Sequence, residues 1–484
     1  MKLQSSFKTY TYGQDKADSP DKVIEKAASS LKHAKIEILQ RVFRIDDLDR
    51  LDIPAFICKS GEEFGGKIGL TDSFGKGATI KQANASALME HVERLSCLNF
   101  VNTNNNFIIA SHAQVKDRAC EPAQLILPFQ NISYRNDPDI INDLKQVPLC
   151  WTDSFSLTKN KEILYPVRWF YYMYGTTGFA AGNTMEEAIL QGLCEVVERH
   201  CISSVVLGQM ETPYIAPDSI KNKIAKNLIA KFQKAGIELF IRDFSLGIGI
   251  PTIQVLAYDS EASLGTIRIY NAAGTHMNSN NALIRALTEV ALNRAQVLFV
   301  EGVEKKQGGP TYCYPPFKNL DEAPYLTDKN EKIAFDSIPT YSNKDFKKEI
   351  EKAVAILSDH DLEVMVTDVT HPVLKIPSVI VSIPGIRLNR PTTRINPYFL
   401  MGRGCMGINK YKEAVKCLEK ALKLNPEERN NPKMLARMGL CYKKIRGYKK
   451  AADYFQNAIE LDPRLIHAKE LFKDFTFVLK KISS

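Results

Sequence analysis

An 18-residue segment occurs twice in this chain, without a gap and at an offset of 105 residues. The two copies are GATIKQANASALMEHVER (77–94) and GNTMEEAILQGLCEVVER (182–199), and eight of their 18 positions are identical. Copies that share one pattern of apolar and polar residues are expected to form the same secondary structure. A weaker third relative, NALIRALTEVALNR (281–294), shares the spacing of the Ala, Leu and Glu residues.

Each copy predicts an amphipathic helix that begins after a glycine turn. Its apolar stripe faces the core, and its polar stripe recurs at intervals of three and four residues. That stripe contains Gln82, Ser86, Glu90 and Glu93 in the first copy, and Glu187, Gln191, Glu195 and Glu198 in the second. Residues three and four apart share a helix face. Each helix therefore aligns two carboxylates, which are followed directly by Arg94 or Arg199.

Duplicated carboxylate stripes predict a metal site. A solvated surface with Glu–Arg pairs would explain one such helix, but the duplication favours two helices that face each other. Converging carboxylates repel one another unless they are protonated or neutralised by cations. Oxygen ligands suit Mg²⁺, which combines carboxylates with phosphate oxygens, and arginines add positive charge beside the phosphates. The sequence therefore predicts a nucleoside triphosphate held through magnesium ions.

Two other kinds of site fit this sequence less well. A di-iron centre would need Glu-x-x-His on facing helices, whereas this chain has Glu-x-x-Glu, and His91 and His200 are out of register. The segment GEEFGGKI (61–68) fits a phosphate loop except that Ile68 replaces the Ser or Thr that would bind magnesium. The glycines at 75–77, which open the first carboxylate helix, are better placed to approach a phosphate.

Runs of apolar, β-branched residues predict buried strands between these helices. They are ELFIRDF (238–244), IPTIQVLAYD (250–259), TIRIYNAAG (266–274) and PSVIVSIPGI (377–386), and the aromatic run WFYYMY (169–174) is interpreted in the same way. Strands that alternate with helices indicate a mixed fold of the α/β or α+β class, and we assign the body to α+β.

The end of the chain contains a different repeat, with copies 37 residues apart. Small and large residues recur in it at Gly402, Ala414, Leu418, Ala421 and Pro426, and at Gly439, Tyr442, Ala451, Phe455, Ala458 and Pro463. This spacing resembles tetratricopeptide repeats, which are paired helices that bind proteins. Residues 464–481 are expected to form a capping helix. We predict a body over 1–393 and an all-α repeat domain over 394–484, with the break near LNRPTTRINP (388–397).

Charge and composition narrow the function further. Residues 395–484 hold 19 basic and 9 acidic residues, whereas the other 394 residues hold 45 and 46, so the net charge of +9 comes from the repeats. A basic surface suits acidic proteins, peptides or RNA, although a solvated helical surface is an equal alternative.

The ten cysteines form no C-x-x-C pair, which argues against a zinc ribbon. No apolar run reaches the ~18 residues that a bilayer crossing needs, and no secretory signal is recognisable, so we expect a cytoplasmic protein without membrane contact.

The duplicated helices resemble a known family. Ser86, Glu90, Glu93 and Arg94 form the S-x-x-x-E-x-x-E-R pattern of YcaO-type enzymes, and the segments 179–199 and 271–294 are similar to the second and third patterns of that family. The resemblance covers residues 5–390. It implies an ATP- and Mg²⁺-dependent enzyme in which a nucleophile adds to a peptide amide and ATP phosphorylates the resulting oxygen, so that phosphate can leave.

The resemblance also implies roles for individual residues. The magnesium ligands would be Glu90, Glu93, Glu195 and Glu198, and the phosphate contacts would be Lys16, Arg94 and Arg199. Of these, Arg94 and Arg199 would be the catalytic residues, which stabilise the charge in transfer. The remaining nucleotide contacts would be Ser86, Asn183, Glu187 and Arg294. The chain departs from the family pattern at Ala180, where Ser is usual, at Val23, where a hydroxyl residue is frequent, and at Leu292, where Gln is usual. Each departure removes one polar contact.

Several functions remain open within this resemblance. The preferred reaction is thioamidation, or related sulfur incorporation, on a peptide or protein backbone. The alternatives are an accessory factor for methylthiolation of a ribosomal protein, an azoline-forming cyclodehydratase, and a repeat-scaffolded nucleotide-binding protein without turnover. Azoline formation ranks lower because the azoline-forming members of the family end in Pro-x-Pro-x-Pro, and the body of this chain lacks that motif. We expect a separate partner protein for substrate recognition or sulfur delivery, and protein contacts through the repeats. A homodimer is compatible with this interpretation.

Overall fold

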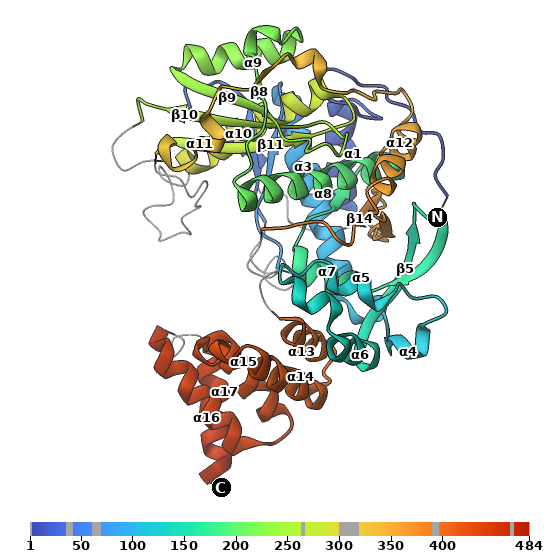
Figure 1. Cartoon of the computed structure of the whole chain (residues 1–484), viewed down its shortest axis with the longest axis vertical. Helices are drawn as coiled ribbons and strands as arrows, with labels where there is room; N and C mark the ends of the chain where they lie inside the picture. The colour runs from blue at the N-terminus through green and yellow to red at the C-terminus, as the bar shows by residue number, and fades with distance from the viewer. Residues whose placement is uncertain are drawn as a thin grey trace. The chain divides into compact units, whose positions relative to one another are not determined.

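The computed structural model describes residues 2–34, 42–60, 69–262, 267–299, 319–389, 396–464 and 469–483. The segment GEEFGGKI (61–68), compared above with a phosphate loop, and the centre of the expected linker, 390–395, lie outside the described residues. The chain divides into two compact units (Figure 1). The first contains residues 1–103, 154–162 and 176–389, and the second contains 104–153, 163–175 and 390–484. Among the described helices, none combines the length and apolar character needed to cross a bilayer.

The first unit is built on an antiparallel sheet with the order β11-β10-β9-β8-β12, whose last pair alone is parallel. Its strands are β8 (Tyr214–Ile215), β9 (Ile237–Asp243), β10 (Thr252–Asp259), β11 (Ile269–Thr275) and β12 (Lys332–Ile333). The strands predicted over 238–244, 250–259 and 266–274 are confirmed as β9, β10 and β11. Helices α9 (Lys223–Lys234) and α10 (Ser279–Phe299) bury their apolar faces in the core of this sheet.

Shorter strands complete the first unit. β1 (Val42–Arg44), β2 (Ala55–Cys58) and β3 (Ser73–Lys76) form a small antiparallel sheet. β7 (Phe179–Ala181) pairs with β14 (Ser378–Ser382), which pairs with β13 (Met365–Asp368), and the end of β5 (Pro148–Ser156) also pairs with β13. β14 confirms the strand predicted over 377–386. The remaining long helices of this unit are α1 (Pro20–His33), α3 (Ile80–Asn102), α8 (Met185–Gly208) and α12 (Phe346–Ser358).

The repeated segment forms a strand followed by a helix, as β3–α3, β7–α8 and β11–α10. Thr79 and Thr184 cap α3 and α8, because their side chains accept hydrogen bonds from the backbone three residues on. Helix and strand approach closely. A Cβ at Gly75 would lie 2.1 Å from the carbonyl oxygen of Ala83, and one at Gly274 would lie 2.2 Å from that of Ala282. Small residues at these positions therefore fix how each helix lies on its strand.

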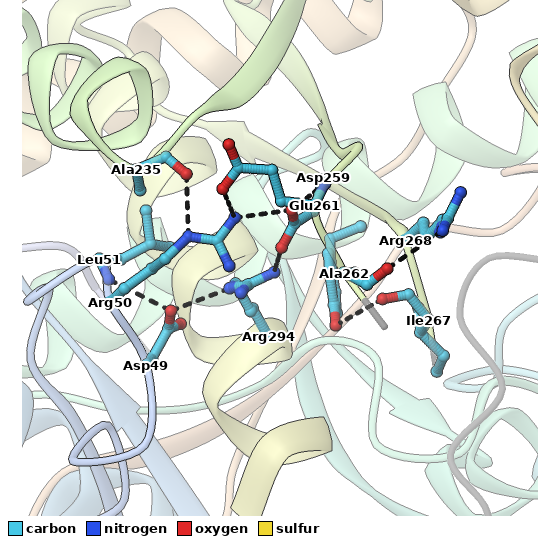
Figure 2. A network of polar contacts seen from close by, with 11 residues as sticks. Asp49, Arg50, Leu51, Ala235, Asp259, Glu261, Ala262, Ile267, Arg268 and Arg294 are labelled. Atoms are coloured by element: carbon cyan, nitrogen blue, oxygen red, sulfur yellow. Dashed lines mark hydrogen bonds and ion pairs between the residues drawn. The ribbon is translucent and has the colours of Figure 1, made fainter. Parts of the chain in front are cut away.

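A buried ion network holds the far end of α10 (Figure 2). Arg294 donates from Nε to Asp49 at 2.9 Å and from Nη1 to Asp259 at 2.7 Å, and Arg50 contacts the other oxygen of Asp259 at 2.7 Å. Burial would raise the pKa of Asp259, but the two arginines lower it below its usual range. At Asp49 burial outweighs the effect of Arg294 and raises the pKa. The network joins α10 to β10 and to the segment before β2.

The second unit combines the helical repeats with a segment of the body. Its helices are α4 (His112–Val115), α5 (Pro122–Ile126), α6 (Pro138–Gln146), α7 (Val167–Tyr174), α13 (Pro397–Gly407), α14 (Tyr411–Leu424), α15 (Pro432–Lys444), α16 (Tyr448–Leu461) and α17 (Lys469–Ser483). β4 (Ile108–Ser111) pairs with the start of β5, and β6 (Lys161–Tyr165) also pairs with β5. Tyr134 bonds Asn425, and Lys420 pairs with Asp143, which explains why this body segment belongs with the repeats.

The tail forms the expected paired helices. In the first repeat a Cβ at Gly402 would lie 2.6 Å from the Leu418 side chain, and in the second a Cβ at Gly439 would lie 2.6 Å from the Phe455 ring. These contacts give the physical reason for the small and large residues in each repeat. Helix α17 follows the second pair, in agreement with the predicted capping helix.

The aromatic run WFYYMY is a helix, which corrects the predicted strand. Its residues lie in α7, where Trp169, Phe170, Met173 and Tyr174 are buried and Tyr171 is half-buried. Buried residues that recur at intervals of three and four define one helix face. Six consecutive apolar residues fit either period, and packing decided between them: the ring of Tyr165 stacks on that of Phe170, 4.7 Å between centroids.

Replacement of Gly274 by Ala should lower the free energy of unfolding by about 1–3 kcal/mol, because the added methyl group overpacks the contact between β11 and α10. Urea denaturation followed by circular dichroism measures this change. Gly404→Ala is the matched control, since a Cβ there meets nothing within 4 Å. Equal stabilities of the two variants would contradict the proposed close approach.

Candidate active site

The first unit contains a cavity of about 340 Å³ between the repeated helices and the N-terminal segment. It is lined by side chains of α3, α8 and α10, and by residues from Gly13 to Val23. All but one of the predicted site residues line it: Lys16, Ser86, Glu90, Glu93, Arg94, Asn183, Glu187, Glu195, Glu198 and Arg199. The carboxylate stripes of α3 and α8 therefore meet at one cavity.

Local sequence fixes the register of these stripes. Thr79 and Gln82 form a capping box, in which Thr79 Oγ1 accepts from the Gln82 backbone N–H at 3.3 Å and Gln82 Oε1 accepts from the Thr79 N–H at 3.1 Å. The capped end sets the direction of each later side chain, so Glu90 and Glu93 lie on the cavity side. At the start of α8, the Thr184 side chain accepts a hydrogen bond from the Glu187 backbone N–H at 3.2 Å.

The carboxylates influence one another electrostatically. Burial raises the pKa of Glu93 well above its usual range, and repulsion from Glu195 and Glu90 raises it further, against the opposing effect of Arg94. Burial likewise raises the pKa of Glu195, with a contribution from Glu198 and opposition from Arg199 and Arg94. Glu93 belongs to α3 and Glu195 to α8, so negative charge from both helices is concentrated at one place. A bound cation would relieve this repulsion.

Two arginines and two backbone N–H groups already contact the carboxylates. Arg94 lies 3.0 Å from Glu90 and 3.4 Å from Glu93, and Arg199 lies 3.8 Å from Glu195. The Phe74 N–H donates to Glu90 at 2.7 Å, and the Thr275 N–H donates to Glu198 at 3.1 Å. These contacts orient the side chains while leaving them at the cavity surface.

The N-terminal segment brings a lysine to the same cavity. Lys16 Nζ lies 3.3 Å from Glu187, whose other carboxylate oxygen accepts the Ala17 N–H at 2.8 Å. Asn183 donates to both oxygens of Glu187, at 3.1 and 2.9 Å. The carbonyl oxygen of the Asn183 side chain is buried and has no hydrogen-bond partner among the described residues. An unsatisfied buried acceptor at a cavity fits a ligand that brings a donor.

Sequence reasoning missed two residues of α10. Arg285 donates from Nη1 to Gln191 of α8 at 3.2 Å, and Glu289 forms an ion pair with Lys76; all four residues line the cavity. The sequence pattern that could have identified them is the weaker third relative of the repeat, residues 281–294. Aligned with the second copy, Glu289 falls at the position of Glu195, and Arg285 at that of Gln191.

Comparison with known families agrees with this geometry. The model of the family described as YcaO cyclodehydratase, ATP- and Mg²⁺-binding, matches residues 74–387. The chain belongs to the YcaO family. Two tetratricopeptide repeat models match residues 396–428 and 432–465, which confirms the predicted repeats after the YcaO domain.

Relatives of this YcaO protein differ in how much of the chain they share. A protein of Methanothermobacter thermautotrophicus is 29% identical over 366 residues, covering 72% of this chain and 89% of its own. The ribosomal protein S12 methylthiotransferase accessory factor YcaO of Escherichia coli is 27% identical over 240 residues, covering 46% of this chain and 40% of its own.

Two solved structures share the fold. A heterocyclase in complex with substrate and cofactor is 24% identical with a TM-score of 0.64, and the match covers 80% of this chain and 54% of that one, so this chain spans about half its length. YcaO from Methanopyrus kandleri bound with AMPPCP and Mg²⁺ is 20% identical with a TM-score of 0.56, and the match covers 79% of this chain and 94% of that one. These matches confirm the mixed α and β architecture of the body.

The departures from the family pattern fall on or beside the cavity of this YcaO protein. Val23 and Leu292 line it, and both are buried. Ala180 is buried in β7, next to Ala181, which lines the cavity. Their apolar side chains make these parts of the wall less polar than the family pattern implies.

Cysteines 194 and 201, beside the second carboxylate pair, are packing residues. Both are buried in α8, and burial raises the pKa of each thiol to about 12. A thiol with such a pKa stays protonated at neutral pH and is a poor nucleophile.

Protein side chains alone do not complete a metal site in the part of the chain that the structure describes. No three His, Cys, Asp or Glu side chains there are grouped closely enough to hold an ion. This arrangement suits Mg²⁺, which keeps several waters and is bound through one or two carboxylates together with phosphate oxygens. The residues present therefore fit a magnesium–nucleotide complex.

Arg294 is not a cavity residue, which corrects its assignment as a nucleotide contact. The described residues that line the cavity do not include Arg294. Its guanidinium is buried and forms ion pairs with Asp49 and Asp259, which Figure 2 shows. Arg294 follows Leu292 by two residues on α10, and two residues turn a helix by more than half a turn. Its side chain therefore points away from the cavity that Leu292 lines.

Replacement of Arg294 by Met should lower the free energy of unfolding by about 3–5 kcal/mol, because two buried carboxylates lose a shared cation. Urea denaturation measures the loss. Arg118→Met, which breaks an exposed ion pair with Asp153, is the control and should cost at most about 1 kcal/mol. A stable Arg294→Met protein that failed to bind nucleotide would restore the phosphate role.

Proposed function

We propose that this protein binds ATP with Mg²⁺ in the cavity and uses it to phosphorylate the oxygen of a peptide or protein backbone amide. The single observation that carries the proposal is the convergence of the α3 and α8 carboxylates with Lys16, Arg94 and Arg199 on one cavity. An amide oxygen is a poor leaving group, and its phosphate ester is a good one. Phosphorylation therefore opens the amide carbon to replacement of its oxygen.

The chain's own residues divide the work. Glu90, Glu93, Glu195 and Glu198 would hold magnesium, which when bound supplies positive charge that neutralises the phosphates. Lys16, Arg94 and Arg199 would contact the phosphates, and Arg285 adds a further cation to the same wall. Ser86, Asn183 and Glu187 would bind the rest of the nucleotide. Positive groups fixed before binding stabilise charge in transfer without reorganisation.

Sulfur incorporation, as thioamidation, is the reaction we propose for the activated amide. The second candidate is an accessory role in methylthiolation of a ribosomal protein, which the Escherichia coli relative favours because its name states that role. The repeats, whose net charge is positive while that of the rest of the chain is close to zero, would provide protein contacts with a substrate or with a separate partner.

Replacement of Glu93 or Glu198 by Gln should weaken Mg·ATP binding by about tenfold or more, because a neutral amide of the same size replaces a charged metal ligand. Isothermal titration calorimetry measures the affinity, and circular dichroism confirms that the fold is intact. Glu25→Gln on the exposed side of α1 is the control. Unchanged affinity in both variants would contradict the assignment of the metal ligands.

The reaction itself is tested by incubation with ATP, Mg²⁺, a sulfur donor and candidate protein substrates. We expect phosphate release together with a substrate mass increase equal to the difference between sulfur and oxygen, read by mass spectrometry. A mass decrease equal to one water would instead indicate azoline formation. Nucleotide binding without turnover under every condition would support a scaffold without catalysis and overturn the proposed reaction.

A further inference from the structure

His276 follows β11 and lines the cavity. Its backbone N–H donates to the carbonyl of Pro251 at 3.2 Å, and the preceding N–H, that of Thr275, donates to Glu198 at 3.1 Å. The residue before His276 is therefore bonded to Glu198, a proposed magnesium ligand. The imidazole ring faces Asp15, the residue before Lys16.

Hydrogen bonding fixes which ring nitrogen carries the proton. The backbone N–H of Asn278 donates to His276 Nδ1 at 2.9 Å, so Nδ1 is an acceptor and the proton of the neutral ring is on Nε2. Nε2 lies 3.8 Å from Asp15 Oδ2, which is too far for a hydrogen bond. Nε2 makes no hydrogen bond to another residue in the part of the chain that the structure describes. The cavity wall thus presents a fixed N–H donor that lacks an acceptor.

The charges around the ring favour its neutral form. Burial lowers the pKa of His276 well below its usual range, and the positive charges of Lys8, Arg285 and Lys16 lower it further. The nearby carboxylate of Asp15 is compensated by Lys8, whose Nζ lies 2.7 Å from Asp15 and 2.5 Å from Glu349. A neutral N–H among cations can bind an anionic oxygen without giving up its proton.

We propose that His276 donates a hydrogen bond from Nε2 to a terminal oxygen of the γ-phosphate of the bound nucleotide. The inference rests on the proposed function. It follows from position: the ring faces Asp15, which precedes Lys16, a proposed phosphate contact, and the residue before His276 is bonded to Glu198, a proposed magnesium ligand. His276, Lys16 and Glu198 line the same cavity, so an N–H donor on this wall suits a phosphate oxygen. His276 keeps its proton throughout, so its role is to bind and orient the phosphate.

Two substitutions separate this role from a structural one. In His276→Asn the shorter side chain can still accept the N–H two residues on, as in an Asx turn, so the turn into α10 is kept while the Nε2 donor is lost. In His276→Gln an amide N–H reaches about as far as Nε2 and should restore part of the contact. His33→Asn, on the exposed end of α1, is the matched control.

The test compares binding of Mg·AMPPCP with binding of Mg·ADP by calorimetry, because only the first carries a γ-phosphate group. For His276→Asn we expect the affinity for Mg·AMPPCP to fall about tenfold or more, as for loss of a hydrogen bond to a charged group. The affinity for Mg·ADP should change less than about twofold. In the wild-type protein, ¹⁵N NMR of labelled histidine should show an Nε2–H tautomer that shifts with Mg·AMPPCP and not with Mg·ADP.

The possible failures are distinguishable. Equal weakening of both nucleotides, or no weakening of either, would overturn the γ-phosphate contact and leave the proposed function standing. A protonated ring at neutral pH would also overturn it. A wild-type protein that binds neither nucleotide would overturn the proposed function, and the inference with it.

Discussion

Electrostatic repulsion between carboxylates on two facing helices is the constraint on which this site depends. Glu93 and Glu195 are brought together from α3 and α8, and burial and mutual repulsion both raise their pKa values. Burial makes such an arrangement costly, and arginines on the same helices compensate part of the charge. The remaining negative charge is what the proposed magnesium ions would neutralise.

The N-terminal segment belongs to the active site although it is distant in sequence from everything it contacts. Ser6 contacts Thr184 and Asp345, Lys8 contacts Glu349, and Lys16 contacts Glu187. These contacts tie the segment to the first turns of α8 and α12. Lys16, which faces the cavity, is thereby held by the first turn of α8.

Repetition in the sequence made much of this fold and site predictable. Helices α3 and α8, their capping threonines and their carboxylate stripes follow from local patterns of three and four residues, and the strands β9 to β11 and β14 follow from β-branched runs. Patterns with an ambiguous period gave the errors. The run 169–174 has apolar residues at every position, so its period is ambiguous, and the tertiary packing in which Tyr165 stacks on Phe170 is not visible in that pattern.

Sequence by itself determined which side chains share a helix face, because that depends only on spacing along a helix. The spacing places Glu90 and Glu93 on one face of their helix, and Glu195 and Glu198 on one face of theirs. Tertiary structure alone decided which faces meet, because contact between distant segments depends on packing of the whole unit. For this reason Arg285 and Glu289 line the cavity while Arg294, on the same helix, is turned into a buried ion network with Asp49 and Asp259.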